Sequence, residues 1–487
     1  MLIYIKGLPS VYEPENIARL FFAGAKLTRQ YTPGADLVLA RAGRRRLAAG
    51  VRQNGRCAVL FAPAPADPKQ AEFQLAGLVY RLLRSVTGQR PPWGMLTGVR
   101  PVRIIHDQRA LGRTESQIEA LFLQHYDCTP EKFGLVRAIA DLQAPLLAHR
   151  RPRDYSLYIG IPFCPSRCSY CSFVSLSTQR EAKLMEPYLQ ALCAEIRAIR
   201  AQAAQCGLNL KTIYIGGGTP TSLSAQGLRT LMGTVAECFD LSRVQEYTVE
   251  AGRPDCTDAE KLAVLKEYGA TRISINPQTF SDGVLQAIGR RHTAQDIIDC
   301  FEQARALGHG NINMDLIAGL PGDTVQGFAN SLRTAIALSP ENITVHTLTL
   351  KRASNLVIGA APSAYDDVAA MLRECEQLAA AGYLPYYLYR QKNTLQNLEN
   401  TGWCKPGFEG YYNIYIMEEV HSILSAGAGG STKLCQPGGD KIQRIFNYKY
   451  PAEYISGFET ILQRKQGVSD FYARYLDPQT AGGSQPD

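Results

Sequence analysis

Residues 157–173 read LYIGIPFCPSRCSYCSF, a β-rich apolar run followed by three cysteines, Cys164, Cys168 and Cys171. The cysteines therefore lie in a loop directly after a predicted strand. Thiolates are the usual ligands of iron–sulfur centres, and three of them leave one iron of a four-iron cluster without a protein ligand. Such an open iron suits a cluster that binds a substrate or cosubstrate directly.

Structural zinc and unrelated buried thiols are the alternative interpretations of these cysteines. A structural zinc site completes four ligands, and the sequence continues with neither a matching cysteine pair nor a His-x3-5-His motif. The chain has 13 cysteines, an odd number scattered over its length, and no export signal, which argues against a disulfide framework. The sequence therefore favours an iron–sulfur cluster.

Short β-rich runs alternate with amphipathic helical patterns beyond this first strand. Such alternation predicts parallel strands with right-handed crossovers, and six units predict a partial (β/α)6 barrel in an α/β fold. Chemistry is expected at the C-terminal ends of the strands. The strands are expected at residues 157–161, 212–215, 246–249, 272–275, 312–317 and 343–348, and the helices at 181–204, 224–239, 258–268, 294–307 and 324–338.

The length of 487 residues suits two to four domains, and we divide the chain into three parts. Residues 1–150 are expected to form an α/β accessory domain, with a hairpin turn at Asn54-Gly55 between β-rich runs at 37–40 and 58–62. Helical periods follow at 71–86, 115–126 and 131–148. Residues 151–355 form the predicted barrel, and residues 356–487 are expected to cover the substrate.

The charge of the chain is concentrated in its first third. Residues 1–153 hold 23 Lys and Arg against 11 Asp and Glu, whereas the remainder holds 29 against 33. A basic module of this kind suits nucleic acid, an acidic partner or a polycarboxylate ligand. No recognisable RNA-binding signature accompanies it, so we expect no nucleic-acid partner.

The composition excludes several classes of protein. Apolar residues make up 45% and charged residues 20%, which is ordinary globular usage and excludes disordered tails, collagen and coiled coils. The longest apolar runs fall short of the roughly 20 residues that a membrane span needs, and the N-terminus does not resemble a signal peptide. We therefore expect a monomeric cytoplasmic protein without a membrane span.

Polar residues follow several of the later predicted strands. A glycine-rich turn, Gly216-Gly217-Gly218-Thr219-Pro220-Thr221, comes after the second strand, and Glu250 ends the third. Gln278 and Arg290 follow the fourth strand, and Asp315 ends a run in the fifth. Glycines allow a close approach of the backbone to a ligand, and the common placement puts acceptors and an arginine around one mouth.

The cysteine loop resembles that of the radical S-adenosylmethionine (SAM) superfamily. This resemblance implies a [4Fe–4S] cluster held by Cys164, Cys168 and Cys171, whose open iron chelates the amino and carboxylate groups of SAM. It places Tyr170 beside the adenine and makes the glycine-rich turn, through Gly217, Gly218 and Thr219, a SAM motif. One-electron reduction then cleaves SAM to methionine and a 5′-deoxyadenosyl radical that abstracts hydrogen from the substrate.

Several segments resemble one family within this superfamily, the oxygen-independent coproporphyrinogen III oxidases. They are residues 158–164, 216–221, 289–290 and 315–321, and residues 93–101 and 410–419 resemble its coproporphyrinogen dehydrogenase (HemZ) subgroup. The resemblance assigns Tyr158 to the SAM site, Glu250 to the SAM amino group and Arg290 to its carboxylate, with Arg291 as a possible substitute. It assigns Gln278 and Asp315 to the ribose hydroxyls.

The family implies a porphyrinogen tetracarboxylate as substrate, two of whose propionates become vinyl groups, and an unidentified electron donor. A basic site would suit this anion, so Arg100, Arg103 and Lys405 are candidate propionate contacts. Two departures from the oxidase pattern, Phe173 in place of a fourth cysteine and Gly160 in place of a histidine, recur in relatives that act as haem chaperones.

Two other functions therefore stay open. A haem chaperone of the same fold would bind haem, with His292, His346 or His421 as candidate axial ligands. A tRNA-modifying radical enzyme would use the basic N-terminal module to bind RNA.

Overall fold

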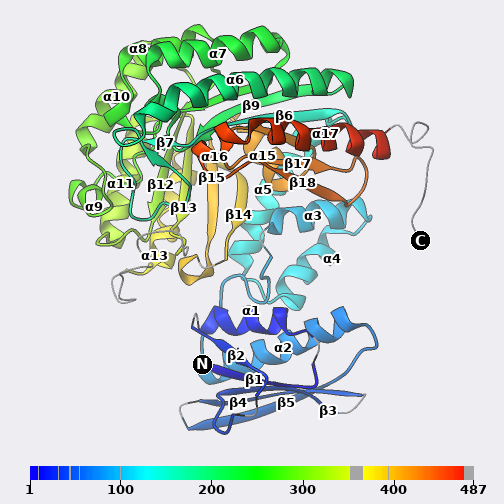
Figure 1. Cartoon of the computed structure of the whole chain (residues 1–487). Coiled ribbons are helices and arrows are strands. Elements are labelled where there is room, and N and C mark those ends of the chain that lie inside the picture. The colour runs from blue at the N-terminus through cyan, green and yellow to red at the C-terminus, as the bar shows by residue number, and fades with distance from the viewer. Residues whose placement is uncertain are drawn as a thin grey trace. The chain divides into compact units, whose positions relative to one another are not determined.

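The computed structural model describes residues 1–8, 10–22, 24–30, 32–42, 45–53, 55–98, 100–350, 366–392 and 394–476 (Figure 1). The chain forms two compact units. The first contains Met1–Ala140 and Arg390–Glu399, and the second contains Asp141–Tyr389 and Asn400–Asp487. This division differs from the boundaries expected at residues 150 and 355, the second of which lies outside the described residues.

The first unit is built on a five-stranded sheet with the order β2-β1-β3-β4-β5. Helices α1 (Tyr12–Phe21) and α2 (Pro68–Thr87) contribute their apolar faces to its core. The strands are β1 (Leu2–Lys6), β2 (Lys26–Thr28), β3 (Leu37–Ala42), β4 (Arg46–Gln53) and β5 (Arg56–Pro63). Of the turn expected at residues 54–55, Gly55 is described and directly precedes β5, whereas Asn54 lies outside the described residues. The strand paired with β5 is β4, which the sequence analysis overlooked. The run at residues 37–40 pairs with β4 and lies one strand further along.

Further helices follow this sheet, namely α3 (Pro101–Ala110), α4 (Glu115–Ala120) and α5 (Pro130–Ala148). The helix expected at 115–126 begins with a capping box at Thr114 and continues as a π-helical turn over Leu121–His125. The end of α5 belongs to the second unit, because Leu147 packs there against Tyr386 and Tyr387.

The segment Arg390–Glu399 belongs to the first unit because its two ends are fixed there. The Glu399 carboxylate is almost fully buried and accepts hydrogen bonds from Nε1 of Trp93 (2.8 Å) and Nζ of Lys132 (2.5 Å). The Arg390 guanidinium lies 5.1 Å from the centre of a Trp93 ring. Loss of one partner of a buried ion pair is strongly destabilising, because it leaves the other charge buried and unpaired. These contacts therefore hold the segment in the first unit.

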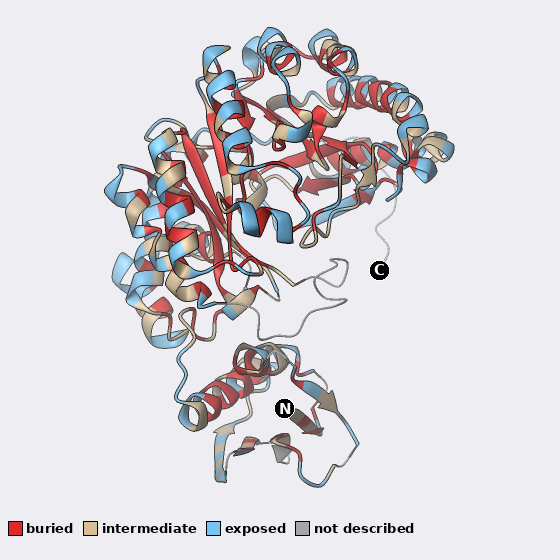
Figure 2. Ribbon diagram, turned by 90° about the vertical axis from the view of Figure 1, so that its left-hand side faces the viewer, coloured by how far each residue is buried: buried red, intermediate tan, exposed pale blue. Residues whose placement is uncertain are grey.

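The second unit contains the predicted barrel, and the α/β fold class is confirmed. Six parallel strands are hydrogen-bonded in the order β6-β9-β10-β11-β12-β13. Each coincides with an expected strand, because a buried parallel strand reads as a continuous apolar run (Figure 2). Their bounds are β6 (Asp154–Ile161), β9 (Asn209–Gly217), β10 (Glu246–Glu250), β11 (Arg272–Ser274), β12 (Ile312–Ala318) and β13 (Asn342–Thr347).

The crossover helices also follow the expected pattern. Five were expected, namely α6 (Ala182–Gln205), α7 (Ala225–Cys238), α8 (Ala259–Glu267), α10 (Ala294–Ala306) and α11 (Val325–Leu338), whereas α9 (Asp282–Ala287) was not. Side-chain caps start several of them, as Ser224 does for α7 and Thr293 for α10. Buried residues line one face of each, and the outward faces are exposed (Figure 2).

The C-terminal region extends the barrel sheet on both sides, so it does more than cover a mouth. Strand β15 (Glu399–Cys404) pairs antiparallel with β13, and β14 (Leu384–Arg390) lies beyond it. On the other edge β16 (Ser422–Ala426) pairs parallel with β6, followed by β17 (Ser431–Cys435) and β18 (Ile442–Phe446). An open six-stranded sheet leaves two edges with unpaired backbone groups, and these strands satisfy them.

Short and long helices complete this region, namely α13 (Val368–Arg373), α14 (Glu376–Ala380), α15 (Tyr411–Glu418), α16 (Pro451–Ser456) and α17 (Phe458–Tyr475). Among the described residues, none of the helices has the length and apolarity needed to cross a membrane.

Candidate functional site

The three cysteines of the predicted cluster lie in the loop after β6. Cys164 ends the short strand β7 (Phe163–Cys164), which pairs with β8 (Leu176–Ser177). The amide of Cys171 donates to the carbonyl of Cys168 at 3.1 Å, which folds the loop back on itself. Burial raises the pKa of the Cys164 and Cys171 thiols, and the neighbouring cysteines raise both further, so the three thiols lie close enough to interact electrostatically.

The donor set suits a cluster better than a single ion. Across the described ranges, no three His, Cys, Asp or Glu side chains gather as ligands of one metal ion. A cubane cluster offers a separate iron to each thiolate, so its ligands need not converge on one point as zinc ligands do. Three thiols on one loop, two of them almost fully buried, fit that requirement. Binding would release the thiol protons, because thiolates are the ligands.

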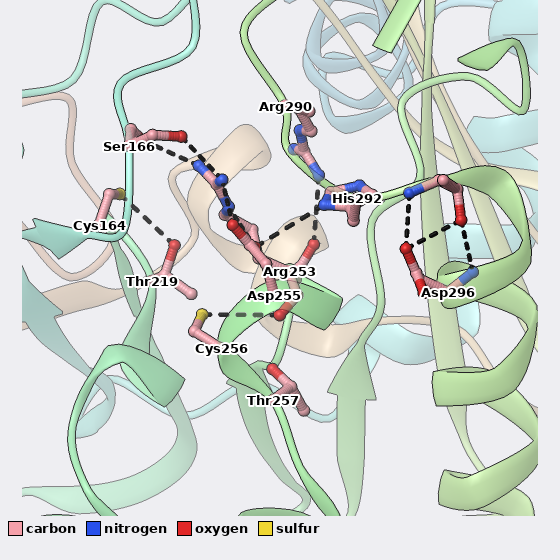
Figure 3. A network of polar contacts seen from close by, with 12 residues as sticks. Cys164, Ser166, Thr219, Arg253, Asp255, Cys256, Thr257, Arg290, His292 and Asp296 are labelled. Atoms are coloured by element: carbon pink, nitrogen blue, oxygen red, sulfur yellow. Dashed lines mark hydrogen bonds and ion pairs between the residues drawn. The ribbon is translucent and has the colours of Figure 1, made fainter. Parts of the chain in front are cut away.

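The glycine-rich turn after β9 lies directly against the cysteine loop. The amides of Gly218 and Thr219 donate to the carbonyls of Ile161 and Phe163, each at 2.8 Å. The Thr219 hydroxyl lies 3.4 Å from Sγ of Cys164 (Figure 3). A Cβ on Gly218 would stand 2.6 Å from the carbonyl oxygen of Phe163. A glycine is therefore required here because the backbone of the turn lies so close to that of the cysteine loop. The sequence analysis had instead explained the glycines by a close approach of the backbone to a ligand.

Glu250 ends β10 as expected. The hydroxyl of Tyr214, on β9, donates to Oε1 of Glu250 at 2.7 Å. Burial raises the pKa of Glu250 to about 7; the Tyr214 hydrogen bond opposes the shift and the charge of Asp315 adds to it. A Cβ on Gly216 would stand 2.9 Å from this carboxylate, so any larger residue here would displace the Glu250 side chain.

A stack of tyrosines lies beside Glu250. The rings of Tyr158 and Tyr214 are stacked with centroids 6.2 Å apart, and Tyr412 of α15 stacks on Tyr214 at 4.5 Å. Tyr158 and Tyr214 are register partners on adjacent strands, so their side chains point to the same face of the sheet. Sequence reasoning placed Tyr158 in the site and missed Tyr214. Residues two apart on a strand face the same side of a sheet, so Tyr214 could have been predicted from its position two residues before Gly216.

Arg290 reaches the cysteine loop from the segment between α9 and α10. Its guanidinium donates to the carbonyl of Asn276 at 2.8 Å and to the hydroxyl of Tyr170 at 3.1 Å. Its Nε is buried and has no hydrogen-bond partner among the described residues, so one donor of the fork is left for a ligand. Arg291 is exposed, which favours Arg290 as the residue of the site.

Gln278 and Asp315 are joined through the backbone. The Gln278 amide donates to the Asp315 carbonyl at 2.8 Å, and the Gln278 carbonyl accepts from the amide of Ile317 at 2.9 Å. Gln278 has a φ of 69°, a left-handed conformation that a non-glycine residue rarely adopts. Asp315 lies within β12 rather than at its end, and the imidazole of His346 stands 3.7 Å from its carboxylate.

Sequence reasoning missed a network of polar contacts beside the cysteine loop, shown in Figure 3. The Arg253 guanidinium forms two hydrogen bonds with the Asp255 carboxylate, and Nδ1 of His292 lies 3.7 Å from Asp255. Arg253 also donates to Ser166 of the cysteine loop. Only the position of Arg253, three residues after Glu250, hinted at this role.

The candidate propionate contacts do not gather at this site. The Lys405 ammonium donates to the carbonyl and hydroxyl of Ser339, which precedes β13. Lys405 therefore lies at the N-terminal end of the strands, opposite the cysteine loop, and the expectation for it is wrong. It follows β15, which runs antiparallel to β13. Arg100 and Arg103 belong to the first unit and stay predictions.

The three candidate haem ligands are placed differently from one another. His421 is buried, with Nε2 2.8 Å from the Ser156 hydroxyl and its ring against Tyr415. His292 is buried beside Asp255, and His346 is partly exposed between Asp315 and Tyr389.

Comparison with known proteins identifies the superfamily of the chain. The radical SAM superfamily matches residues 158–335. The chain is 37% identical over 486 residues to the oxygen-independent coproporphyrinogen-III oxidase-like protein HemZ of Bacillus subtilis, covering 96% of this chain and 97% of that protein. It is also similar to the heme chaperone HemW of Escherichia coli, at 31% identity over 65% of this chain and 79% of the chaperone.

Solved structures agree on the fold. The coproporphyrinogen III oxidase HemN of Escherichia coli, described as a radical SAM enzyme, superimposes with a TM-score of 0.50 at 24% sequence identity. The similarity covers 66% of this chain and 72% of that one.

Proposed function

Because the chain belongs to the radical SAM superfamily, and within it to the family of the oxygen-independent coproporphyrinogen-III oxidase-like protein HemZ, we propose that it decarboxylates coproporphyrinogen III without oxygen. Each of two propionates would lose a β-hydrogen atom to a radical, CO2, and one electron to an external one-electron acceptor, which leaves two vinyl groups and gives protoporphyrinogen IX. The superfamily uses a [4Fe–4S] cluster and SAM, which are therefore the cofactors. When bound, they supply a radical that abstracts a hydrogen atom from the substrate.

The observation that carries this proposal is the meeting of four distant segments at the C-terminal ends of the strands. Thr219 contacts Cys164, Arg290 contacts Tyr170, and Tyr214 contacts Glu250. A site built on the ends of several parallel strands holds its groups rigidly and leaves room for a cosubstrate among them.

We assign the residues to roles as follows. The thiolates of Cys164, Cys168 and Cys171 would hold the cluster. The carboxylate of Glu250 would accept from the SAM amino group, and Arg290 would use its unpaired Nε toward the SAM carboxylate.

The remaining contacts would orient the rest of the cosubstrate. Tyr170 would lie beside the adenine, and Gln278 and Asp315 would take the ribose hydroxyls. The backbone of Gly217, Gly218 and Thr219 and the ring of Tyr158 would close the pocket against water.

A haem chaperone of the same fold is the second candidate function. It is favoured by the similarity to the heme chaperone HemW of Bacillus subtilis, 43% identical over 40% of this chain and 50% of the chaperone. Burial disfavours His421 and His292 as haem ligands, whereas His346 is partly exposed and is the candidate of the three that an iron could reach.

An assay with both readouts separates the two functions. The full-length protein is loaded anaerobically with iron and sulfide and incubated with SAM, dithionite and coproporphyrinogen III. The proposal predicts products with one and two vinyl groups and one 5′-deoxyadenosine for each vinyl group formed, and no product from Cys168→Ala. Intact substrate together with a stable complex of added haem would overturn the proposal and establish the chaperone.

A further inference from the structure

Arg253 lies against the cysteine loop but has no part in the roles assigned above. It is in the segment that follows β10, and its residue is 4% exposed. One amino group of the guanidinium donates to the Ser166 carbonyl at 2.8 Å, and the other donates to the Ser166 hydroxyl at 2.9 Å (Figure 3). The group that contacts the carbonyl also lies 3.8 Å from Sγ of Cys168.

Asp255 fixes the guanidinium from the opposite side. Nε of Arg253 donates to Oδ1 at 2.9 Å and Nη2 donates to Oδ2 at 2.7 Å, which is a bidentate pair. Such a pair fixes the plane of the guanidinium as well as its position. The N–H group that faces Cys168 is therefore held toward the sulfur before any cofactor binds.

We propose that Arg253 is a positioning residue that favours one-electron reduction of the cluster through its N–H group and buried charge beside Cys168. This inference rests on the proposed ligation of the cluster by the cysteine loop. The electron comes from an external low-potential one-electron donor and adds one negative charge to the cluster. A hydrogen bond to a ligand sulfur and a nearby cation both stabilise the more negative state, which raises the reduction potential.

Burial makes this contribution large compared with that of other charges on the loop. Charges in the interior are screened weakly, whereas exposed charges are screened by water and salt. Arg167 precedes Cys168 in the chain and is exposed. Arg290 is also buried and close enough to Cys168 to interact with it electrostatically, and its proposed partner is the SAM carboxylate.

The potential is measured on the full-length protein by anaerobic reductive titration followed by electron paramagnetic resonance, without SAM or porphyrinogen. Each variant is compared at equal iron and sulfide content. In Arg253→Met we expect the equilibrium constant for reduction to fall at least tenfold, which corresponds to about 59 mV for one electron. Arg253→Lys keeps the charge without the fork, so its potential should lie between those of the methionine variant and the wild type.

Two further variants distinguish an electrostatic effect of Arg253 on the reduction potential from a structural loosening of the cysteine loop. Asp255→Asn removes a negative charge from the same network, so it should raise the reduction potential, opposite to Arg253→Met. If the substitutions acted only by loosening the loop, both would shift the potential in the same direction. Arg167→Met removes an exposed charge of the loop and should shift the potential by less than a third as much as Arg253→Met. If Arg253→Met takes up no iron, Arg253→Lys replaces it in this comparison. The inference then requires a lower potential in Arg253→Lys and a higher one in Asp255→Asn, and shifts of one sign would overturn it.

An unchanged potential in Arg253→Met at equal cluster content would overturn the inference. So would shifts of one sign in the Arg253 and Asp255 variants, or an equal shift in Arg167→Met. Because the titration uses no substrate, a protein with the expected potentials but no decarboxylation would overturn the proposed function alone.

Discussion

The hydroxyl of Tyr214 donates a 2.7 Å hydrogen bond to Oε1 of Glu250, which links two adjacent strands of the barrel at their C-terminal ends. This bond stabilises the ionised carboxylate, while burial disfavours it, and the pKa of Glu250 stands at about 7. The proposed SAM contact needs the ionised form, so its strength should depend on pH in the neutral range.

We expect the affinity for SAM to rise with pH through about 7, because the fraction of ionised Glu250 rises. The increase between pH 6 and pH 8 should be roughly tenfold for a single group that titrates at this pKa. Equilibrium dialysis with the cluster-loaded protein measures it. Glu250→Gln should flatten the profile and weaken binding at pH 8 by roughly tenfold to a hundredfold.

Tyr214→Phe provides the matched variant for that experiment. It removes a hydrogen bond that lowers the pKa of Glu250, so the midpoint of the profile should move to higher pH. A midpoint that stays in place, or moves to lower pH, would contradict the role of Tyr214.

Gly218→Ala should disrupt the cysteine loop. The new Cβ would stand 2.6 Å from the carbonyl oxygen of Phe163, so one of the two segments must shift. Overpacking of this kind costs about 1–3 kcal/mol, and here it also displaces Cys164. We expect lower stability by urea denaturation and a reduced iron content. Gly283→Ala, in α9 where a Cβ meets nothing within 4 Å, is the control and should leave both unchanged or improved.

Much of this architecture could be predicted from the sequence because it depends on local periodicity. The six barrel strands and their crossover helices follow from apolar runs and helical spacing, and the cysteine loop follows from its spacing alone. The strand before the turn at residues 54–55 was missed because Arg46–Gln53 is interrupted by polar and small residues.

Contacts that depend on tertiary placement could not be predicted in this way. Lys405 was expected to contact a propionate, yet which end of a sheet a residue reaches depends on the direction of its strand, and β15 runs antiparallel to β13. The contact of Arg253 with the cysteine loop depends on how the segment after β10 turns. No periodicity encodes that conformation.

Lys405→Met tests the corrected position of this residue. Its ammonium interacts with Ser339 at the N-terminal end of β13, away from the proposed site. We expect an unchanged KM for coproporphyrinogen III and a loss of stability of at most about 1 kcal/mol. A severalfold rise in KM without loss of stability would restore Lys405 as a propionate contact.

His421 should make the protein sensitive to acid. Burial and the nearby charges of Lys433 and Lys211 lower the pKa of His421 to about 3, from an ordinary value of 6.5. The unfolded chain therefore binds a proton that the folded chain does not, and stability falls as the pH drops below 6.5. Between pH 7 and pH 5 this residue should account for about 2 kcal/mol of the loss.

The measurement is the free energy of unfolding at both pH values in the wild type and in His421→Gln. The variant should lose less stability on acidification, and His149→Gln, at an exposed position, should behave like the wild type. Equal losses in all three proteins would show that His421 is not held neutral by burial.

The most direct test of the whole account is electron paramagnetic resonance of the reduced, reconstituted protein before and after SAM is added. The account predicts about four irons and four sulfides for each chain, by analogy with the cluster type, and a signal that changes when SAM binds the open iron. Both should be lost when Cys164, Cys168 and Cys171 become alanine, and retained in Cys256→Ala, which changes a partly buried cysteine in the network beside the cysteine loop. A full cluster in the triple variant, or a wild-type signal that SAM leaves unchanged, would contradict it.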